Sequence, residues 1–537
     1  MPTRVIDVRS PDGPSALRLV SGQGMCEPYM ALSYCWGVTA DDILTLTPKT
    51  FACMTQCIAE SDLAQAHQDT VSLARALGIR YIWIDALCII QGDEQDWTRE
   101  SRKMAQVYGN ATLTVVAGRS ADARNGYIDN FVDSSQAGAP SPCRLPVGGT
   151  PASDADSSNG GVVMVSLPRS TDLGPVVTRA WCCQERTCCR RAVMFGTEQL
   201  FFECETLRIY ENGLIADRPA ARFAFDQPPP PLTLSSSAHP DELRDRREAT
   251  LRKWYDFLYV YTACRLSDPH DIFAAIAAIA QRAARALDSR YLAGIWECDM
   301  LRGLLWKPCY HLEVSRNARL VTTRPKPTRL AGAARDSRVV RAPSWSWAAV
   351  EGPVSHESAT PPNMARFRDP AYARARPACA GSARWTREDD DDDDERCGPD
   401  KLRVPALELR LIGRLAAVRV SQHGECALSV DDYIAQTYPR GRRRALRINV
   451  EGLPLLGLGA ALGLADDPCG RVVGIGLFDV REEREGVDIV YCLPLVRDKG
   501  LLLAKSGNGR SFSRLGWFWV EKEAWFSSHE ETEVHLC

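Results

Sequence analysis

The stretch Tyr29-Met30-Ala31-Leu32-Ser33-Tyr34-Cys35-Trp36-Gly37 decides the fold of the N-terminal part of this chain. Its first half is a short apolar run, which is typical of a buried strand, and its final glycine can close that strand. A helical pattern of apolar residues follows at His67–Leu77, and Gly78 can cap its end. A second run of β-branched and aromatic residues, Tyr81–Asp85, comes next. This alternation predicts repeated β-α units.

The same alternation continues further along the chain. Asp93 stands where a helix N-cap is expected, and Ala111–Ala117 has the composition of a third strand. A further helix is predicted to begin near Thr178–Trp181, followed by strand-like pairs at Ala192–Phe195 and Gln199–Phe202. We therefore expect an α/β domain in the N-terminal part.

A chain of 537 residues is too long for one ordinary core, so two or three domains are expected. Breaks in periodicity occur at Pro228–Pro231 and at the acidic run Glu388–Glu395, which is interpreted as a solvated linker. The last part of the chain has the turn-rich pattern of short strands. The predicted division is residues 1–215 as the α/β domain, 216–240 as a Pro/Ser-rich linker, 241–365 as a helical and mixed region, 366–400 as an acidic linker and 401–537 as a mostly β region.

Composition narrows the class of protein. The formal net charge of −3 and the pI near 6.3 give no reason to expect nucleic acid as a partner. No secretory signal and no membrane span are predicted, because apolar runs of the required length are missing. The twenty cysteines are then expected to be free thiols in a cytoplasmic compartment. The arginine-rich run Arg440–Arg444 is interpreted as a solvated loop, with a partner site as the alternative.

Three blocks occur in a fixed order, Ala31–Gly37, Ile82–Gln91 and Arg179–Glu185. Each alone has a structural explanation, but together they resemble the heterokaryon-incompatibility (HET) domain over residues 29–185. Two later segments, Tyr291–Trp296 and Ala342–Ala348, resemble what often follows that domain. The resemblance implies a fungal protein of non-self recognition and programmed cell death, with a second copy or another incompatibility protein as its partner.

The chain departs from the family pattern at two places. Many members carry Asn where this chain has Ile90, which argues against a polar role there. Cys182 and Cys183 replace a threonine and an aliphatic residue, and they are expected to pack as small hydrophobes.

HET domains are in turn similar to Toll/interleukin-receptor (TIR) domains, which implies a flavodoxin-like parallel sheet. In that family an early strand ends in a Ser-Tyr pair, matched here by Ser33 and Tyr34. A later helix carries Trp-Cys-x-x-Glu, matched by Trp181 and Glu185. The last two are four residues apart, so they share one helical face.

This arrangement suits cleavage of the N-glycosidic bond of NAD, here a substrate rather than a bound cofactor. Breaking that bond develops oxocarbenium character on the ribose, which a carboxylate can stabilise while an aromatic face stacks the leaving ring. The catalytic candidate is Glu185. The candidate substrate-binding residues are Ser33, Tyr34, Trp36, Asp85 and Trp181.

Structural alternatives stay open for these residues. Trp181 can be a core residue with Glu185 paired to a nearby arginine, and Asp85 can simply cap a turn. Ser33 is disfavoured as a nucleophile because no block supplies a histidine partner. A zinc site is disfavoured because the paired cysteines at 182–183 and 188–189 lack the usual ligand spacing.

Three hypotheses for the function remain. The domain is an NAD-consuming enzyme, or it is a non-enzymatic self-association module that triggers death. In the third, the regions after residue 240 recognise the trigger and control the first domain.

Overall fold

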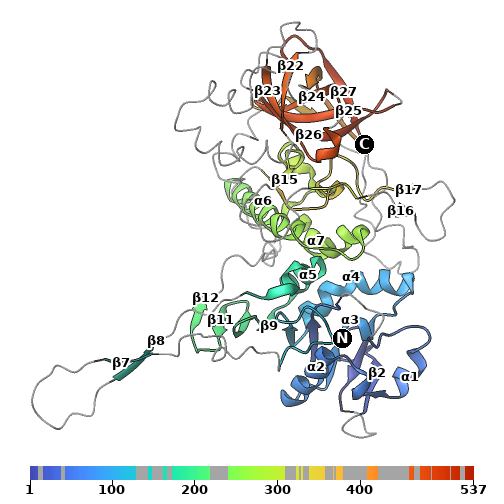
Figure 1. Cartoon of the computed structure of the whole chain (residues 1–537), viewed down its shortest axis with the longest axis vertical. Coiled ribbons are helices and arrows are strands. Elements are labelled where there is room, and N and C mark those ends of the chain that lie inside the picture. Colours follow the sequence, from blue (N-terminus) through green and yellow to red (C-terminus); the bar gives the residue numbers. More distant parts are fainter. Residues whose placement is uncertain are drawn as a thin grey trace, which may run out of the picture. The chain divides into compact units, whose positions relative to one another are not determined.

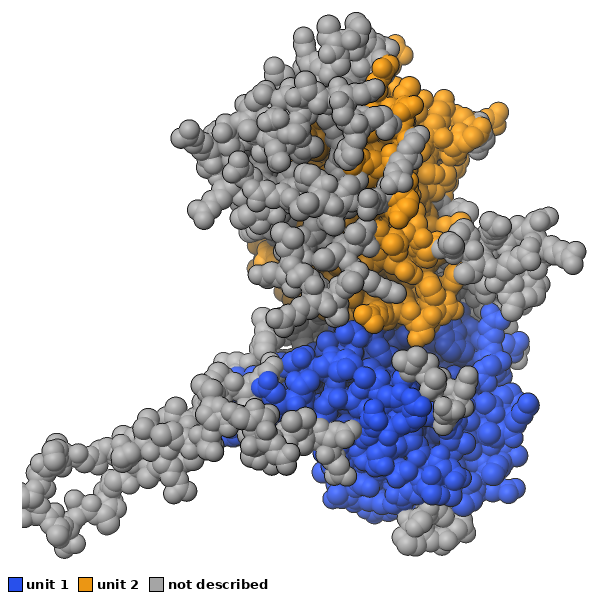
Figure 2. Space-filling view, viewed as in Figure 1, with its two compact units in different colours: residues 1–222 blue, residues 223–537 orange. Residues whose placement is uncertain are grey.

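A computed structural model gives the structure of the chain in two compact units, Met1–Arg222 and Phe223–Cys537 (Figure 2). The residues that it describes are 1–9, 16–37, 43–128, 143–147, 161–165, 172–217, 240–308, 322–325, 328–329, 338–356, 367, 371–378, 408–420, 459–464, 472–484, 487–507, 509–520 and 526–537.

The first unit is built on one ten-stranded mixed sheet (Figure 1). Its strands in spatial order are β12 (Ile215–Asp217), β11 (Leu207–Tyr210), β10 (Leu200–Cys204), β9 (Arg191–Phe195), β6 (Leu113–Val116), β3 (Tyr29–Ser33), β5 (Tyr81–Trp83), β1 (Arg4–Asp7), β2 (Ala16–Ser21) and β4 (Ile58–Ala59). A separate hairpin is formed by β7 (Cys143–Val147) and β8 (Gly161–Val165).

The centre of this sheet is parallel. Strand β3 pairs in parallel with β5 on one side and β6 on the other, and β6 pairs in parallel with β9. The crossovers from β3 to β5 and from β5 to β6 run in opposite directions across the sheet, so their helices cover opposite faces (Figure 1). The helices of this unit are α1 (Phe51–Gln56), α2 (Gln65–Ala76), α3 (Asp85–Cys88), α4 (Glu94–Asn110) and α5 (Ala180–Cys188), with short 3-10 turns η2 (Glu60–Asp62) and η3 (Gly174–Thr178).

Local sequence signals place these elements where they were predicted. The Asp93 carboxylate accepts hydrogen bonds from the amides of Gln95 and Asp96, which caps α4. Gly78 adopts φ +75° after α2, the left-handed conformation of a helix C-terminus. Gly37 has φ +104°, and a Cβ there would lie 2.2 Å from the Asp122 carboxylate, so only glycine fits at the end of the first block.

The sheet is mixed, whereas an entirely parallel sheet was expected. The antiparallel strands β1 and β2 come from residues before the first block and add to β5 through β1. On the other side β10, β11 and β12 extend β9 by successive antiparallel pairs. Short connections favour antiparallel pairing within β1–β2 and within β9–β12, whereas β1 and β5 are far apart in the sequence.

The second unit combines helices with a nine-stranded sheet. Its helices are α6 (Pro240–Thr262), α7 (Ala277–Leu287) and α8 (Met300–Leu304), with 3-10 turns η4 (Pro269–Ile272), η5 (Ala274–Ile276), η6 (Glu297–Asp299), η8 (Trp347–Ala349) and η10 (Arg481–Glu483). Short strand pairs are β13 (Tyr291–Leu292) with β14 (Ile295–Trp296), β15 (Lys307–Pro308) with β18 (Val354–Ser355), and β16 (Thr328–Arg329) with β17 (Arg338–Val339). The large sheet contains β19 (Ala375–Pro377), β20 (Leu409–Arg414), β27 (Glu531–Leu536), β26 (Phe512–Val520), β23 (Val472–Phe478), β22 (Gly459–Leu464), β21 (Ala416–Val420), β24 (Ile489–Val496) and β25 (Lys499–Lys505).

Six of these strands form a closed ring. The order β26-β23-β22-β21-β24-β25 closes because β25 also pairs with β26, and all six pairings are antiparallel. Buried apolar side chains, among them Val418, Phe478, Leu502 and Phe518, form one core of this sheet. The predicted mostly β character of the C-terminal region is therefore confirmed.

The helical segment and the β-rich segment share a core. Leu304 and Trp345 pack in one cluster with Leu493 and Leu501 of the large sheet. The fully buried Arg514 binds Asp479 and donates to the carbonyl of Trp306 at 2.6 Å. Residues 240–356 and 408–537 thus belong to one folding unit.

The two later sequence segments meet within this unit. The Ser346 hydroxyl donates to the Ala293 carbonyl at 2.6 Å, and the Trp347 indole donates to the Gly294 carbonyl at 2.8 Å. Gly294 has φ +99°, and a Cβ there would lie 2.4 Å from the Trp347 indole nitrogen. The two segments therefore pack against each other.

Several sequence predictions fall outside the described residues. These are the proline and serine runs of the first linker, the acidic run 388–395 and the basic run 440–444. Among the helices of the described ranges, none is both long and apolar enough to cross a bilayer.

Candidate functional site

The candidate residues gather beyond the carboxyl ends of the central parallel strands. Ser33 ends β3, and Tyr34 and Trp36 follow it directly. Asp85 is the first residue of the short helix α3, two residues after β5. Glu185 comes from α5, which contacts β3. The crossover that leaves β3 runs to β5 and the one that leaves β6 runs to β9, so the two diverge at this point, where ligands bind in open α/β sheets.

Asp85 is partly exposed and has its hydrogen bonds satisfied. One carboxylate oxygen accepts from the Trp36 indole at 2.8 Å, and the other accepts from the Ala86 amide at 2.7 Å. Burial raises the pKa of this carboxyl, although Arg179 and these donors oppose the shift. Asp85 thus caps the turn after β5, as the structural alternative predicted, and also holds Trp36 in place.

Glu185 is buried, and no cation is paired with it among the described residues. Its side chain is 3% exposed, and one carboxylate oxygen makes no hydrogen bond of standard geometry. Among the described residues, no arginine or lysine forms an ion pair with it. The predicted structural alternative, a direct pair between Glu185 and a neighbouring arginine, is therefore not formed.

Burial changes the acidity of Glu185. It raises the pKa of this carboxyl to about 7, only partly opposed by the positive charge of Arg179 and by Ser33 and Cys182 nearby. The negative charge of Asp85 adds to the increase. Both protonation states of Glu185 are accessible near neutral pH, as acid-base or electrostatic catalysis requires.

Two further polar groups at the end of β3 are also buried. The hydroxyls of Ser33 and Tyr34 are buried and make no hydrogen bond of standard geometry with described residues. Buried polar groups are normally paired, because an unpaired one costs about 1–3 kcal/mol. Ser33 lies beside Glu185 and Tyr34 beside Asp85, so these side chains form one buried polar cluster next to the carboxyl end of β3.

Arg179 joins the cluster in a role that the sequence did not assign. It is the N-cap residue of α5, and its guanidinium donates to the carbonyl of Tyr34. Burial lowers its pKa, but the charges of Cys182, Asp85 and Glu185 outweigh this and raise it overall, so Arg179 stays charged. The sequence suggested it only as an ion-pair partner for Glu185.

Trp181 is partly buried and packs edge to face against Trp97 of α4, with ring centroids 6.1 Å apart. The structure thus groups Ser33, Tyr34, Asp85 and Glu185 around Arg179, whereas the ring of Trp181 packs on the neighbouring helix. Its proposed stacking role remains a prediction.

His67 is a neighbour of the site that sequence reasoning missed. Its fully buried ring packs edge to face on the Tyr34 ring, with centroids 5.1 Å apart, and neither nitrogen has a hydrogen-bond partner among the described residues. Burial lowers the pKa of His67 to about 4, so it is neutral at physiological pH. Its helical spacing with Thr70, Val71 and Ala74 on the buried face of α2 was the available signal.

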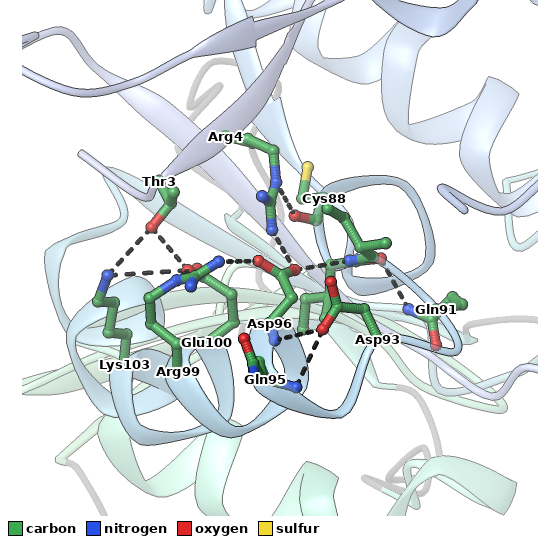
Figure 3. Close-up of polar contacts among 12 residues, drawn as sticks. Thr3, Arg4, Cys88, Gln91, Asp93, Gln95, Asp96, Arg99, Glu100 and Lys103 are labelled. Carbon is green, nitrogen blue, oxygen red and sulfur yellow. Dashed lines mark hydrogen bonds and ion pairs between the residues drawn. The ribbon is translucent and has the colours of Figure 1, made fainter. Parts of the chain in front are cut away.

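A second buried acidic cluster lies at the N-terminal half of α4 (Figure 3). Asp96 is paired with Arg4 and Arg99, and it also accepts from the Ile90 amide at 2.8 Å. Glu100 accepts from the Thr3 hydroxyl at 2.8 Å. This cluster ties the N-terminal strand to the loop before α4 and is fully satisfied.

The fold and the site together define an α/β domain with an unsatisfied acidic cluster at its central strand ends. In the family scan, residues 29–185 match the model described as Heterokaryon incompatibility protein (HET), which supports the predicted HET domain. The match covers Ser33, Tyr34, Asp85, Arg179 and Glu185. No curated protein and no solved structure matched the chain. In the described ranges, no three His, Cys, Asp or Glu side chains are grouped as metal ligands.

Proposed function

We propose that this chain is a heterokaryon-incompatibility-type signalling protein, which acts in non-self recognition and triggers programmed cell death. The match of residues 29–185 to the HET family carries this proposal. The central strand order β5-β3-β6-β9 corresponds to 2-1-3-4 in chain order, the beginning of the flavodoxin-like order. This agreement supports the TIR-like interpretation of the domain.

Expression in a fungal host tests the signalling proposal. The full chain should cause death when its partner or trigger is present, and it should signal through self-association or through another incompatibility protein. Removal of residues 223–537, the whole second unit, should change the trigger dependence if that unit controls the first. Survival of cells that express both the full chain and its candidate partners would contradict the proposal.

A second candidate function is hydrolysis of NAD, favoured by one specific observation. Glu185 is a buried carboxyl that is neither paired with a cation nor fully hydrogen bonded among the described residues, in a cluster at strand ends. Structural carboxylates avoid this condition because it costs stability. A ligand that binds next to Glu185 would complete its interactions and would explain why the buried carboxyl has no paired cation in the described part of the chain.

The proposed chemistry assigns one role to each group. The Glu185 carboxylate stabilises the ribose oxocarbenium as nicotinamide leaves with the bonding electron pair. Water then adds to the sugar carbon and gives up a proton to solvent or to a neighbouring base, which yields ADP-ribose. Asp85, Trp36, Ser33 and Tyr34 would contact the substrate, and Trp181 would stack on the leaving ring.

Nicotinamide release by purified and concentrated full chain tests this candidate. Glu185→Gln should lower the rate by about 10²–10³, the range seen when a preorganised charge-stabilising group is removed. Glu205→Gln changes a 61%-exposed carboxylate, and it should leave the rate unchanged. No nicotinamide release by the folded wild-type chain would remove this candidate. If Glu185→Gln cells still die as wild-type cells do, signalling does not need this chemistry.

A further inference from the structure

The side chain of Arg179 occupies an unusual position among the arginines of the first unit. Several arginines of this unit bind carboxylates directly, as Arg4 does with Asp96, Arg80 with Asp7 and Arg208 with Glu203. Within the part of the chain that the structure describes, Arg179 has one hydrogen bond, to the Tyr34 carbonyl, and no ion pair. A guanidinium has five N–H donors, so most of its capacity is unused.

The surroundings of Arg179 hold its side chain in place and leave most of its N–H donors without a hydrogen bond to the described residues. Its single bond fixes the guanidinium to the backbone just beyond β3, and the Cys182 thiol lies 3.8 Å from the same carbonyl oxygen. Asp85 is occupied by Trp36 and Ala86. The Arg179 side chain is partly exposed, so an incoming ligand can reach it.

A fixed guanidinium with unused parallel N–H groups is suited to a bidentate anion. Phosphate and carboxylate oxygens match the spacing of the arginine fork, and such paired bonds are among the strongest in proteins. The place is also favourable, because Arg179 stands beside the strand ends at which the crossovers diverge. The buried side chains of Tyr34 and Glu185 lie next to Arg179, so a ligand on the guanidinium would be close to both.

We propose that Arg179 is a phosphate-binding residue, which anchors a phosphorylated nucleotide at the carboxyl end of β3. This inference rests on the second proposed function and gives it a substrate class. It places the phosphate on Arg179 and the sugar next to Glu185. The guanidinium binds the phosphate oxygens and orients the ligand, and it takes no part in bond cleavage.

Calorimetric titration of the full chain with three probes tests this assignment. NAD and inorganic pyrophosphate contain the phosphate groups, whereas nicotinamide riboside has the glycosidic bond and no phosphate. Arg179→Gln should weaken NAD and pyrophosphate at least tenfold and leave nicotinamide riboside within about twofold. Arg179→Lys keeps the charge and loses the forked pair of N–H donors. Its affinities for NAD and pyrophosphate should lie between those of wild type and Arg179→Gln. Arg190→Gln, at a 67%-exposed arginine close by in sequence, should change none of the three.

The outcomes separate this inference from the enzymatic proposal. Unchanged pyrophosphate and NAD affinities in a folded Arg179→Gln protein would overturn the phosphate assignment, even if NAD is hydrolysed. The assignment is equally overturned if the wild-type chain binds neither NAD nor pyrophosphate. Arg179-dependent binding of pyrophosphate without any nicotinamide release would support the phosphate site and remove the glycohydrolase proposal. Equal melting temperatures of Arg179→Gln, Arg179→Lys and wild type show that the fold is intact.

Discussion

Two buried carboxyl clusters of the first unit differ in how their charges are compensated. Around Asp96, which is 1% exposed, two arginines and a backbone amide satisfy the carboxylate. Around Glu185, which is 3% exposed, no cation is paired and one oxygen has no partner among the described residues. Burial is nearly equal, so the difference lies in the partners. The first arrangement stabilises the fold, and the second leaves interactions for a ligand to complete.

The largest effect is expected when the satisfied cluster is broken. Asp96→Ala leaves Arg4, which is 11% exposed, without its partner and removes the acceptor of the Ile90 amide. Breaking a buried pair in this way costs about 3–5 kcal/mol. Chemical denaturation of the full chain should show this loss in the transition of the first unit.

The control for that variant is Asp62→Asn, at an exposed carboxylate of the same unit, which should stay within about 0.5 kcal/mol. A loss below about 1 kcal/mol for Asp96→Ala would show that the compensated cluster contributes little. The contrast with Glu185 would then have no energetic basis.

The second prediction concerns the uncompensated cluster and has the opposite sign. The pKa of Glu185 is about 7 in the folded chain against an ordinary value of 4.5, so the folded state binds its proton more tightly. The stability that this provides is complete below pH 4.5 and is lost as the pH rises through 7. The Gln side chain of Glu185→Gln carries no charge, so the variant does not lose this stability as the pH rises.

The variant should therefore become more stable than wild type as the pH rises from about 5 to about 8, by at most about 3 kcal/mol. Paired urea titrations at the two pH values measure the difference, in which all other titrating groups cancel. A stability difference between variant and wild type that stays the same at both pH values would mean that the Glu185 charge is compensated in solution.

Much of the fold was predictable because local signals agree with the tertiary structure. The apolar runs at β3, β5 and β6 and the Asp93 cap of α4 all lie at their predicted places. The antiparallel extension through β1 was missed, because the pairing partner of an N-terminal hairpin is decided by the edge that remains open. The shared core of the second unit was also missed, because packing between distant segments leaves no periodic signal.

The candidate site was predictable in its members and not in its pairings. Asp85 and Glu185 could be named from the blocks, since strand ends and helical spacing can be seen in a sequence. That Asp96 has cations and Glu185 has none within the described chain could not be seen, because Arg4 and Arg179 are equally plausible partners until the chain folds. Arg4 is 92 residues from Asp96. Arg179 is only six residues from Glu185, yet it turns to the Tyr34 carbonyl.

Asp85 lies between these two extremes and gives the smallest predicted effect. Its carboxylate is hydrogen bonded on both oxygens, although no cation is paired with it among the described residues. Trp36→Phe removes one of the two donors and should cost about 1–2 kcal/mol, since a hydrogen bond to a charged group is worth somewhat more than a neutral one.

A double-mutant cycle with Asp85→Asn isolates the contact between the two side chains. The sum of the stability losses of the two single variants should exceed the loss of the double variant by about 1 kcal/mol, because in the double variant the second substitution has no remaining contact to break. The indole of Trp519 donates to Asp498 at 3.2 Å in the second unit, and a parallel cycle there serves as the reference for such a bond outside any site. Strict additivity at Trp36 and Asp85, with coupling at the reference pair, would mean that the indole does not hold Asp85. Of Trp36 and Arg179, only Arg179 would then be held in place at the site by a hydrogen bond.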